Sequence, residues 1–117
     1  MERRFRLRRA ADFQRLRREG RSWSHPLLVL VACRSGLDVT RVGVIATRKI
    51  GKAVHRNRAK RLLREAARRL HFHLEPGWDL LLIARPEILQ AKEPQVREAL
   101  ALLAREAGLM RGGNGQG

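Results

Sequence analysis

The stretch Lys49–Leu70 reads KIGKAVHRNRAKRLLREAARRL, and its residue types separate when they are placed on a helix at 100° per residue. One face is apolar and wide enough to pack on a hydrophobic core; it carries Ala59, Leu62, Leu63, Ala66, Ala67 and Leu70. The opposite face carries Asn57, Lys60, Arg61, Arg64 and Arg68, with Arg58 and Arg69 along one flank and Arg56 along the other. The stretch therefore predicts an amphipathic helix with a strongly basic outer face.

This basic face has almost no compensating acid. Glu65 is the only acid in the stretch, and it lies one turn after Arg61, where it can pair at i,i+4 spacing. A helix that merely faces solvent ordinarily mixes the signs of its charges, because neighbouring like charges repel. An anionic partner with phosphates opposite the guanidinium groups explains the face better than solvent exposure does. Asn57 adds an amide that can bond a phosphate, a ribose hydroxyl or a base edge.

The whole chain is as basic as this helix. Its 117 residues carry a formal net charge of +15, and 44% of them are apolar, which fits one folded domain. Such a charge indicates RNA, DNA or an acidic membrane surface as partner. Nearly all of it is arginine, which binds phosphate with two prongs and stacks on bases, so nucleic acid is favoured over lipid. A GC-rich or heat-adapted genome would produce the same arginine bias.

The rest of the chain predicts a small α+β fold around the basic helix. We expect a basic arm over residues 1–9, a helix over 10–18, strands over 26–33, 41–47 and 78–84, and a last helix over 94–107. The strand over 41–47 is expected to pair back onto the strand over 26–33. The order α-β-β-α-β-α predicts a two-layer α/β sandwich with a central sheet and helices mainly on one face. We assign one folded, basic domain to residues 1–109 and a flexible glycine-rich tail to residues 110–117.

Cysteine use and hydropathy indicate a cytoplasmic protein. Cys33 is the only cysteine, so no disulfide can form within the chain, and its apolar neighbours predict a buried, inert thiol. No apolar run reaches the roughly 18 residues of a membrane span. We therefore expect no membrane association and no obligate protein partner.

The sequence offers no constellation for catalysis. Its 11 acidic residues are scattered, and His71 and His73 at the helix end have no third ligand nearby. A phosphate-binding glycine loop, a nucleophile elbow and a zinc motif are all missing from the sequence. We expect no catalytic residue and no metal ligand in this chain.

The motif in the basic helix resembles a known family. Residues 49–65, KIGKAVHRNRAKRLLRE, are similar to the RNR signature of the bacterial ribonuclease P protein subunit. The other segments agree in order: FRL at residues 5–7, DF at 12–13, RVGVIATRK at 41–49 and DLLLIAR at 79–85. The resemblance covers about residues 3–107, and RNRxKRxxRE is a long and specific motif.

The resemblance implies a ribonucleoprotein endonuclease that removes the 5′ leader of precursor tRNA. In that family the RNA subunit carries the reaction, with Mg²⁺ bound mainly by the RNA subunit and the substrate, and the protein assists. The family fold is also implied: a mixed sheet in which the basic helix joins two parallel strands by a left-handed crossover. Connection rules alone would predict a right-handed one.

Two binding surfaces follow from the resemblance. The first would contact the RNA subunit and comprises Lys49, Gly51, Lys52, Arg56, Asn57, Arg58, Lys60, Arg61, Arg64 and Arg68. The second would bind the single-stranded leader in a cleft between the first helix and the sheet, and comprises Phe13, Arg17, Val29 and Val31. Packing alone would also explain Phe13 as a core residue of the helix, and Val29 and Val31 as residues of a packed strand.

Two other functions fit a basic domain of this size. A structural RNA-binding protein of the ribosomal type would be equally basic but would have no role in cleavage. A DNA-binding protein would place the basic helix in the major groove and prefer one duplex sequence. The RNR signature argues against the first alternative, and we expect no duplex sequence preference.

Overall fold

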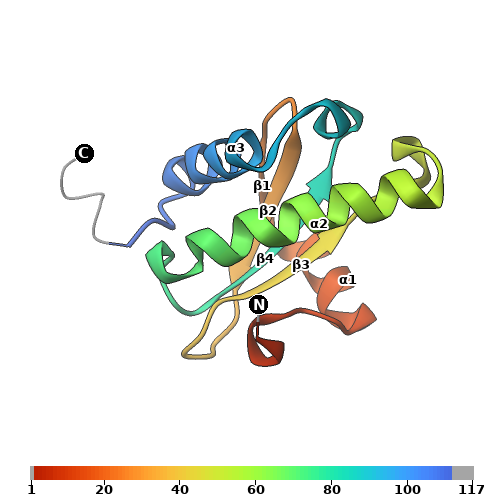
Figure 1. The fold of residues 1–117 in the computed structure, drawn as a ribbon. Coiled ribbons are helices and arrows are strands. Elements are labelled where there is room, and N and C mark those ends of the chain that lie inside the picture. Colours follow the sequence, from red (N-terminus) through yellow and green to blue (C-terminus); the bar gives the residue numbers. More distant parts are fainter. Residues whose placement is uncertain (1, 112–117) are drawn as a thin grey trace.

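The computed structural model describes residues 2–111, so most of the predicted glycine-rich tail, and Met1, lie outside the described residues. Within this range the helices are α1 (Ala10–Glu19), α2 (Ala53–Leu70) and α3 (Glu93–Glu106), and the strands are β1 (Arg21–Ser24), β2 (Leu28–Arg34), β3 (Arg41–Ile45) and β4 (Trp78–Ala84) (Figure 1). Every predicted helix and strand is present, with ends shifted by a few residues. The predicted α+β class is confirmed.

The four strands form one mixed sheet in the order β1-β2-β4-β3. Strand β2 pairs antiparallel with both β1 and β4, and β3 pairs parallel with β4. The expected pairing of residues 41–47 with 26–33 is wrong, because β4 lies between these two segments. Strand β1 was not predicted. It has only four residues at the sheet edge, and of these only Trp23 is even partly buried, so it lacks the apolar signal of an inner strand.

Helix α2 connects the parallel strands β3 and β4 by crossing one face of the sheet. In Figure 1, α2 lies in front of the sheet, and the path from β3 through α2 to β4 turns in the left-handed sense. The left-handed crossover implied by the family resemblance is therefore present. Its consequence is that α2 lies over the parallel edge of the sheet, with its outer face turned away from every strand.

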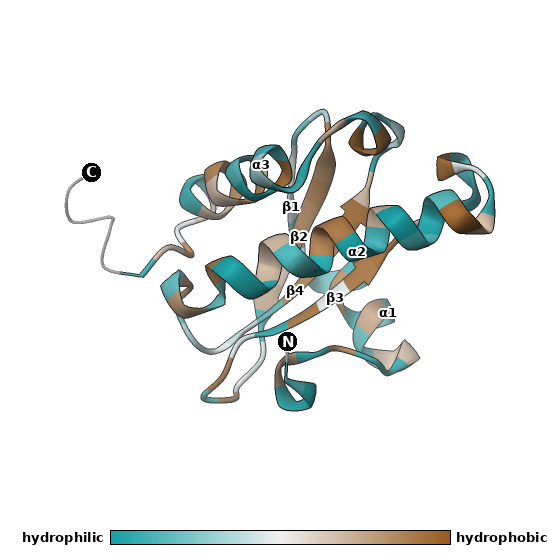
Figure 2. Ribbon diagram, in the orientation of Figure 1, coloured by the Kyte–Doolittle hydropathy of each residue, from teal (hydrophilic) through white to brown (hydrophobic). Residues whose placement is uncertain are grey.

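The main core lies between the sheet and the pair α2 and α3. Alternate residues of the inner strands point to this face, and they include Leu28, Leu30, Leu80 and Leu82, each no more than 2% exposed. The predicted apolar face of α2 packs against them, with Leu62 only partly buried. Figure 2 shows α2, along which hydrophilic and apolar residues alternate, in front of largely apolar strands.

A smaller core lies on the other face of the sheet, under α1 and the N-terminal arm. Leu7, Leu16, Val31 and Leu81 are buried there. The arm is attached to the domain, because the Leu7 backbone N–H donates to the Val42 carbonyl at 2.9 Å and Arg6 forms a parallel bridge with Val42. Both faces of the sheet therefore carry helical cover, although most of it is on the α2 and α3 side.

A buried carboxylate ties α1 to the sheet. Asp79 of β4 is fully buried, and Arg41 of β3 donates to its two oxygens at 2.9 and 2.8 Å. Arg15 of α1 donates to the same carboxylate. The hydrogen bond to Asp79 raises the pKa of the Arg41 guanidinium above its ordinary value. These contacts fix the orientation of α1 on the sheet.

Candidate nucleic-acid interface

The basic helix begins immediately after a glycine that the backbone requires. Gly51 has φ +126°, a region that residues with a Cβ rarely adopt. It separates a short 3₁₀ turn, Arg48–Ile50, from α2, which begins at Ala53. Lys49 and Lys52 are therefore exposed just before the helix rather than within it.

The N-terminal end of α2 is open to an anion. Its first turn contains no acidic residue, and the Lys52 side chain makes no capping hydrogen bond. Arg56 folds back, donating to the Gly51 carbonyl at 2.7 Å. The free backbone N–H groups and the positive end of the helix dipole would both stabilise a phosphate placed here.

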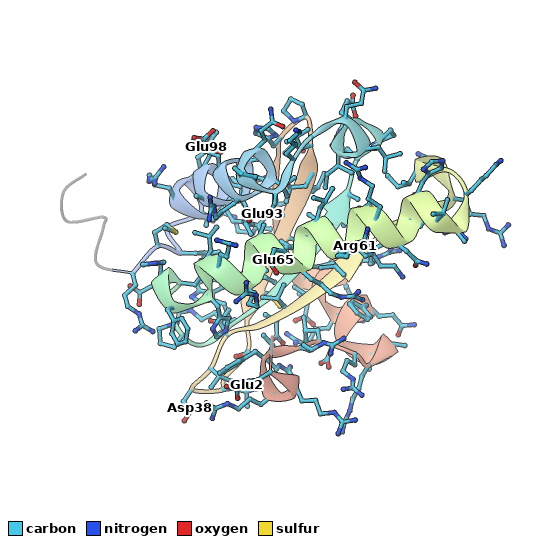
Figure 3. All side chains as sticks on the ribbon, in the orientation of Figure 1. Glu2, Asp38, Arg61, Glu65, Glu93 and Glu98 are labelled. Carbon is cyan, nitrogen blue, oxygen red and sulfur yellow. The ribbon has the colours of Figure 1, made fainter. Side chains whose placement is uncertain are left out.

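The outer face of α2 forms a hollow of about 330 Å³ that we call the basic groove, lined by Asn57, Lys60, Arg61, Arg64, Glu65 and Arg68. Arg61 and Glu65 are labelled along this face of α2 in Figure 3. Among the described residues, no acid forms an ion pair with Lys60, Arg61 or Arg64. These three cations are therefore available to an external anion.

Glu65 neutralises only one end of the groove. It accepts hydrogen bonds from Arg68 and Arg69, with 3.1 Å between its carboxylate and the Nε of each arginine. The expected pair with Arg61 is wrong, because Glu65 reaches forward to these two residues instead. Hydrogen bonds from Arg68 and then Arg69 lower the pKa of Glu65 to about 2. The carboxylate thus stays charged at neutral pH and holds both arginines.

Five predicted contact residues lie outside the groove: Lys49, Gly51, Lys52 and Arg56 around the start of α2, and Arg58 on its flank. Arg58 points along the flank of α2 toward α3, where its guanidinium lies 3.4 Å from the Ala91 carbonyl. Arg58 is exposed overall, but it does not line the hollow with Arg61 and Arg64. Of the predicted RNA-subunit residues, the structure brings together Asn57, Lys60, Arg61, Arg64 and Arg68.

The sheet face under α1 is built from three rows of side chains set by the strand register. The first, which we call the apolar row, joins Val29, Ile83 and Ile45 across β2, β4 and β3. The second joins Val31, Leu81 and Gly43 beneath α1. The third comprises Cys33, Asp79 and Arg41. It lies at the end of this sheet face where Arg15 of α1 contacts Asp79. Only the apolar row is half-buried along its whole length, so it is the row with surface left for a ligand.

Helix α1 presents Phe13 and Arg17 toward the apolar row. Arg15 and Arg17 flank the buried Leu16 on opposite sides of the helix, at 100° per residue. Because Arg15 reaches the row containing Asp79, Arg17 projects toward the opposite side, where the apolar row lies. Phe13 lies on the same side of Leu16 as Arg17 and packs over Gly43.

The structure places the predicted leader residues in two different environments. Phe13, Arg17 and Val29 lie around the apolar row. Val31 is only 8% exposed and packs in the core beneath α1, so it has little surface to offer a ligand. Ile45 and Ile83 were missed. They alternate with core residues along β3 and β4, but which face each one joins is decided by the strand register, which is not visible in the sequence.

A cavity connects the two surfaces. It has a volume of about 330 Å³ at the β3 edge of the sheet, between the arm, α1 and α2. Phe13 and Gly43 line one side of it and Arg64 lines the other. Since Arg64 also lines the basic groove, RNA bound along α2 would pass close to Phe13.

The potential metal ligands of residues 2–111 are dispersed over the fold. No three His, Cys, Asp or Glu side chains in residues 2–111 converge closely enough to hold an ion. Glu65 is the acid that lines the groove, and its oxygens already accept hydrogen bonds from Arg68 and Arg69. Also within these residues, no helix is long and apolar enough to cross a membrane.

Comparison with known proteins agrees with this architecture. Residues 1–108 match the family described as Ribonuclease P. The ribonuclease P protein component of Herpetosiphon aurantiacus is 41% identical over 93% of this chain and 89% of its own length, and that of Chloroflexus aggregans is 43% identical over 94% and 82%.

Two solved structures share the fold. A mutant RNase P protein of Staphylococcus aureus has a TM-score of 0.84 and 30% identity, covering 94% of this chain and 93% of its own. The RNase P protein of Thermotoga maritima has a TM-score of 0.76 and 35% identity, covering 86% and 96%. The chain therefore belongs to the ribonuclease P protein family, as a protein component of the endoribonuclease that processes the 5′ end of tRNA.

Proposed function

We propose that the chain binds the RNA subunit of ribonuclease P through the basic groove and the 5′ leader of precursor tRNA along the apolar row. The observation that carries this proposal is the set Lys60, Arg61 and Arg64 on the outer face of α2, which forms no ion pair within residues 2–111. A helix of 18 residues is about 27 Å long, so its cations can follow several successive phosphates of a folded RNA.

The leader would lie between α1 and the sheet. The apolar row supplies half-buried Val29, Ile45 and Ile83, on which bases can pack, and Arg17 at its rim supplies charge for the backbone. This surface has no exposed aromatic stack of its own, because Phe13 packs over Gly43. Leader binding here would depend on charge and apolar contact, with little sequence preference.

The residue types support a division of labour between protein and RNA. Arginine and lysine screen the repulsion between two RNA molecules, and nothing in residues 2–111 offers a general acid–base pair in the groove. Mg²⁺ would then be held mainly by the RNA subunit and the substrate, because the described acids do not form a site for it. The holoenzyme would act in the cytoplasm, where tRNA precursors are made.

Binding measurements on the reconstituted holoenzyme test both surfaces. Arg61→Ala should weaken assembly with a ribonuclease P RNA, while Arg105→Ala, an exposed arginine on α3, should not. Arg17→Ala should weaken binding of precursor tRNA more than mature tRNA. Its neighbour Arg18, on the side of α1 away from Leu16, is the matched control.

Two results would contradict the proposal. One is unchanged assembly of Arg61→Ala together with a lowered melting temperature, which would make Arg61 a structural residue. The other is equal loss of precursor and mature tRNA binding in Arg17→Ala, which would remove the leader from this surface. Tight binding to ribosomal RNA, with no preference for ribonuclease P RNA, would favour a structural RNA-binding role instead.

A further inference from the structure

An exposed aromatic cluster lies at the C-terminal end of α2. Phe5, His71 and Phe72 form this cluster, which we call the aromatic patch. The ring centroids of Phe5 and His71 are 4.2 Å apart, and those of His71 and Phe72 are 6.2 Å apart in an edge-on arrangement. Phe72 is 80% exposed. A phenylalanine this exposed, beside two further rings, indicates a ligand-binding surface.

Two of the three rings are held firmly in place. The Nε2 atom of His71 lies 2.8 Å from the backbone carbonyl of Thr40, so this nitrogen carries the proton and fixes the ring plane. Phe5 ends the 3₁₀ turn Arg3–Phe5, and the arm that follows is hydrogen-bonded to β3. Phe5 and His71 therefore form a preformed base for the patch, and these two side chains would lose little conformational freedom when a ligand binds.

The surface around the rings is hollowed. One hollow of about 360 Å³ is lined by Glu2, Phe5, Arg68, His71 and Phe72. A second, of about 170 Å³, also contains the three rings and extends toward Thr40 and Arg111. The larger volume lies at the lower end of the roughly 300–1,000 Å³ that is typical of small-molecule sites.

Arginines border this apolar surface, together with Glu2 and Asp38, and the arginines continue into the basic groove. The Arg4 guanidinium lies 4.6 Å over the Phe5 ring and pairs with Glu2 at 3.4 Å. Arg68 lines both the larger hollow and the basic groove, so the two surfaces are contiguous. A flat apolar platform flanked by guanidinium groups complements a base with its phosphates. An uncharged protein segment would gain less from those cations, and a second copy of this chain, with its net charge of +15, would be repelled overall.

We propose that the aromatic patch stacks an unpaired nucleobase of the RNA subunit whose neighbouring phosphates lie in the basic groove. This rests on the proposed function, because it extends the same RNA path beyond the end of α2. Phe72 provides the exposed face, and Arg68, which Glu65 holds at the boundary of the two surfaces, would lie beside the backbone between them. The patch adds a contact that is insensitive to salt to a surface otherwise dominated by charge.

The test compares full-length variants for affinity to a ribonuclease P RNA across a salt series. Phe72→Ala should weaken binding about 5- to 150-fold, the range for losing one stacked base, with an unchanged slope of affinity against salt. Phe72→Trp should retain the affinity, and its fluorescence should fall when RNA binds. Leu102→Ala removes a 44% exposed leucine on α3 and should bind as the wild type does.

Several outcomes would overturn the inference. An RNA affinity of Phe72→Ala equal to that of the wild type would overturn it directly. Loss confined to precursor tRNA binding would place the leader on the patch, and a concentration-dependent dimer that Phe72→Ala abolishes would place a second copy there. If the wild-type chain fails to bind the RNA, the proposed function fails and this inference falls with it. Wild-type binding that Phe72→Ala leaves unchanged overturns the inference alone.

Discussion

The position of α1 on the sheet depends on contacts made by single residues. Asp79 holds Arg15 from α1 and Arg41 from β3, while Gly43 leaves room for the Phe13 ring. Arg17 and Phe13 reach the apolar row only if α1 keeps this orientation. A residue with no contact to RNA can therefore decide whether the proposed leader surface exists.

Replacing Asp79 with asparagine should destabilise the fold. The change leaves Arg15 and Arg41 beside a neutral amide in a site where their side chains are 27% and 24% exposed. Breaking a buried ion pair costs about 3 kcal/mol at the lower end of its range, which suits these partly exposed partners. Chemical denaturation measures the loss, and Asp38→Asn in an exposed turn is the control. Equal stability of the two variants would show that Asp79 does not anchor α1.

Gly43→Ala should displace Phe13. A Cβ at this position would lie 2.5 Å from Phe13 Cε1 and 3.1 Å from Leu7 Cβ, and neither can be accommodated without movement. Overpacking of this kind costs about 1–3 kcal/mol. A double-mutant cycle with Phe13→Leu checks the mechanism, since the smaller side chain should recover part of the lost stability. Strictly additive losses would place the strain elsewhere.

At the scale of elements, periodicity predicted the helices and inner strands well but not how the strands pair. The apolar run of β2 identifies an inner strand without naming its neighbours, so β3 was paired with the wrong partner. Strand β1 was not predicted, because a four-residue edge strand has too little apolar pattern. The same limit applies to the binding surfaces. The basic face of α2 could be predicted from one segment, whereas Ile45 and Ile83 join Val29 only through the register of three strands.

Glu65 sets how much charge α2 offers. Its carboxylate has an ordinary pKa of 4.5 when unfolded and about 2 when folded, so its ion pairs are present above pH 4.5 and are lost as the pH falls toward 2. Glu65→Gln should therefore free Arg68 and Arg69 at neutral pH. We expect tighter binding of ribonuclease P RNA and a steeper salt dependence, by about 0.7–0.9 per added phosphate contact. A shallower slope would mean that Glu65 orients Arg68 for RNA.

The salt dependence of the wild-type chain measures the basic groove itself. If about 6–10 phosphates are contacted, affinity for the RNA subunit should fall roughly 10³- to 10⁵-fold between 50 and 200 mM salt. Arg64→Ala should reduce the slope because Arg64 lines the groove and makes no ion pair among the described residues. Arg105→Ala should leave it unchanged. A shallow wild-type slope would argue against a phosphate-binding groove.

At the scale of the whole molecule, the chain is a compact support for one exposed cationic helix. The left-handed crossover places α2 over the parallel edge of the sheet, and α1 occupies the opposite face. The basic groove, the cavity at the β3 edge and the apolar row consequently lie around one side of the domain. Its net charge of +15 would attract RNA over distances longer than any single contact.

If the basic helix serves an RNA that performs the cleavage, the protein alone should not hydrolyse precursor tRNA. The most direct test is the hydrolysis of labelled precursor tRNA at low Mg²⁺ by a ribonuclease P RNA alone, by this protein alone, and by the two together. We predict cleavage at the 5′ end of the mature tRNA only in the combined reaction. Robust hydrolysis by the protein alone, or no stimulation of the RNA by the protein, would contradict the account.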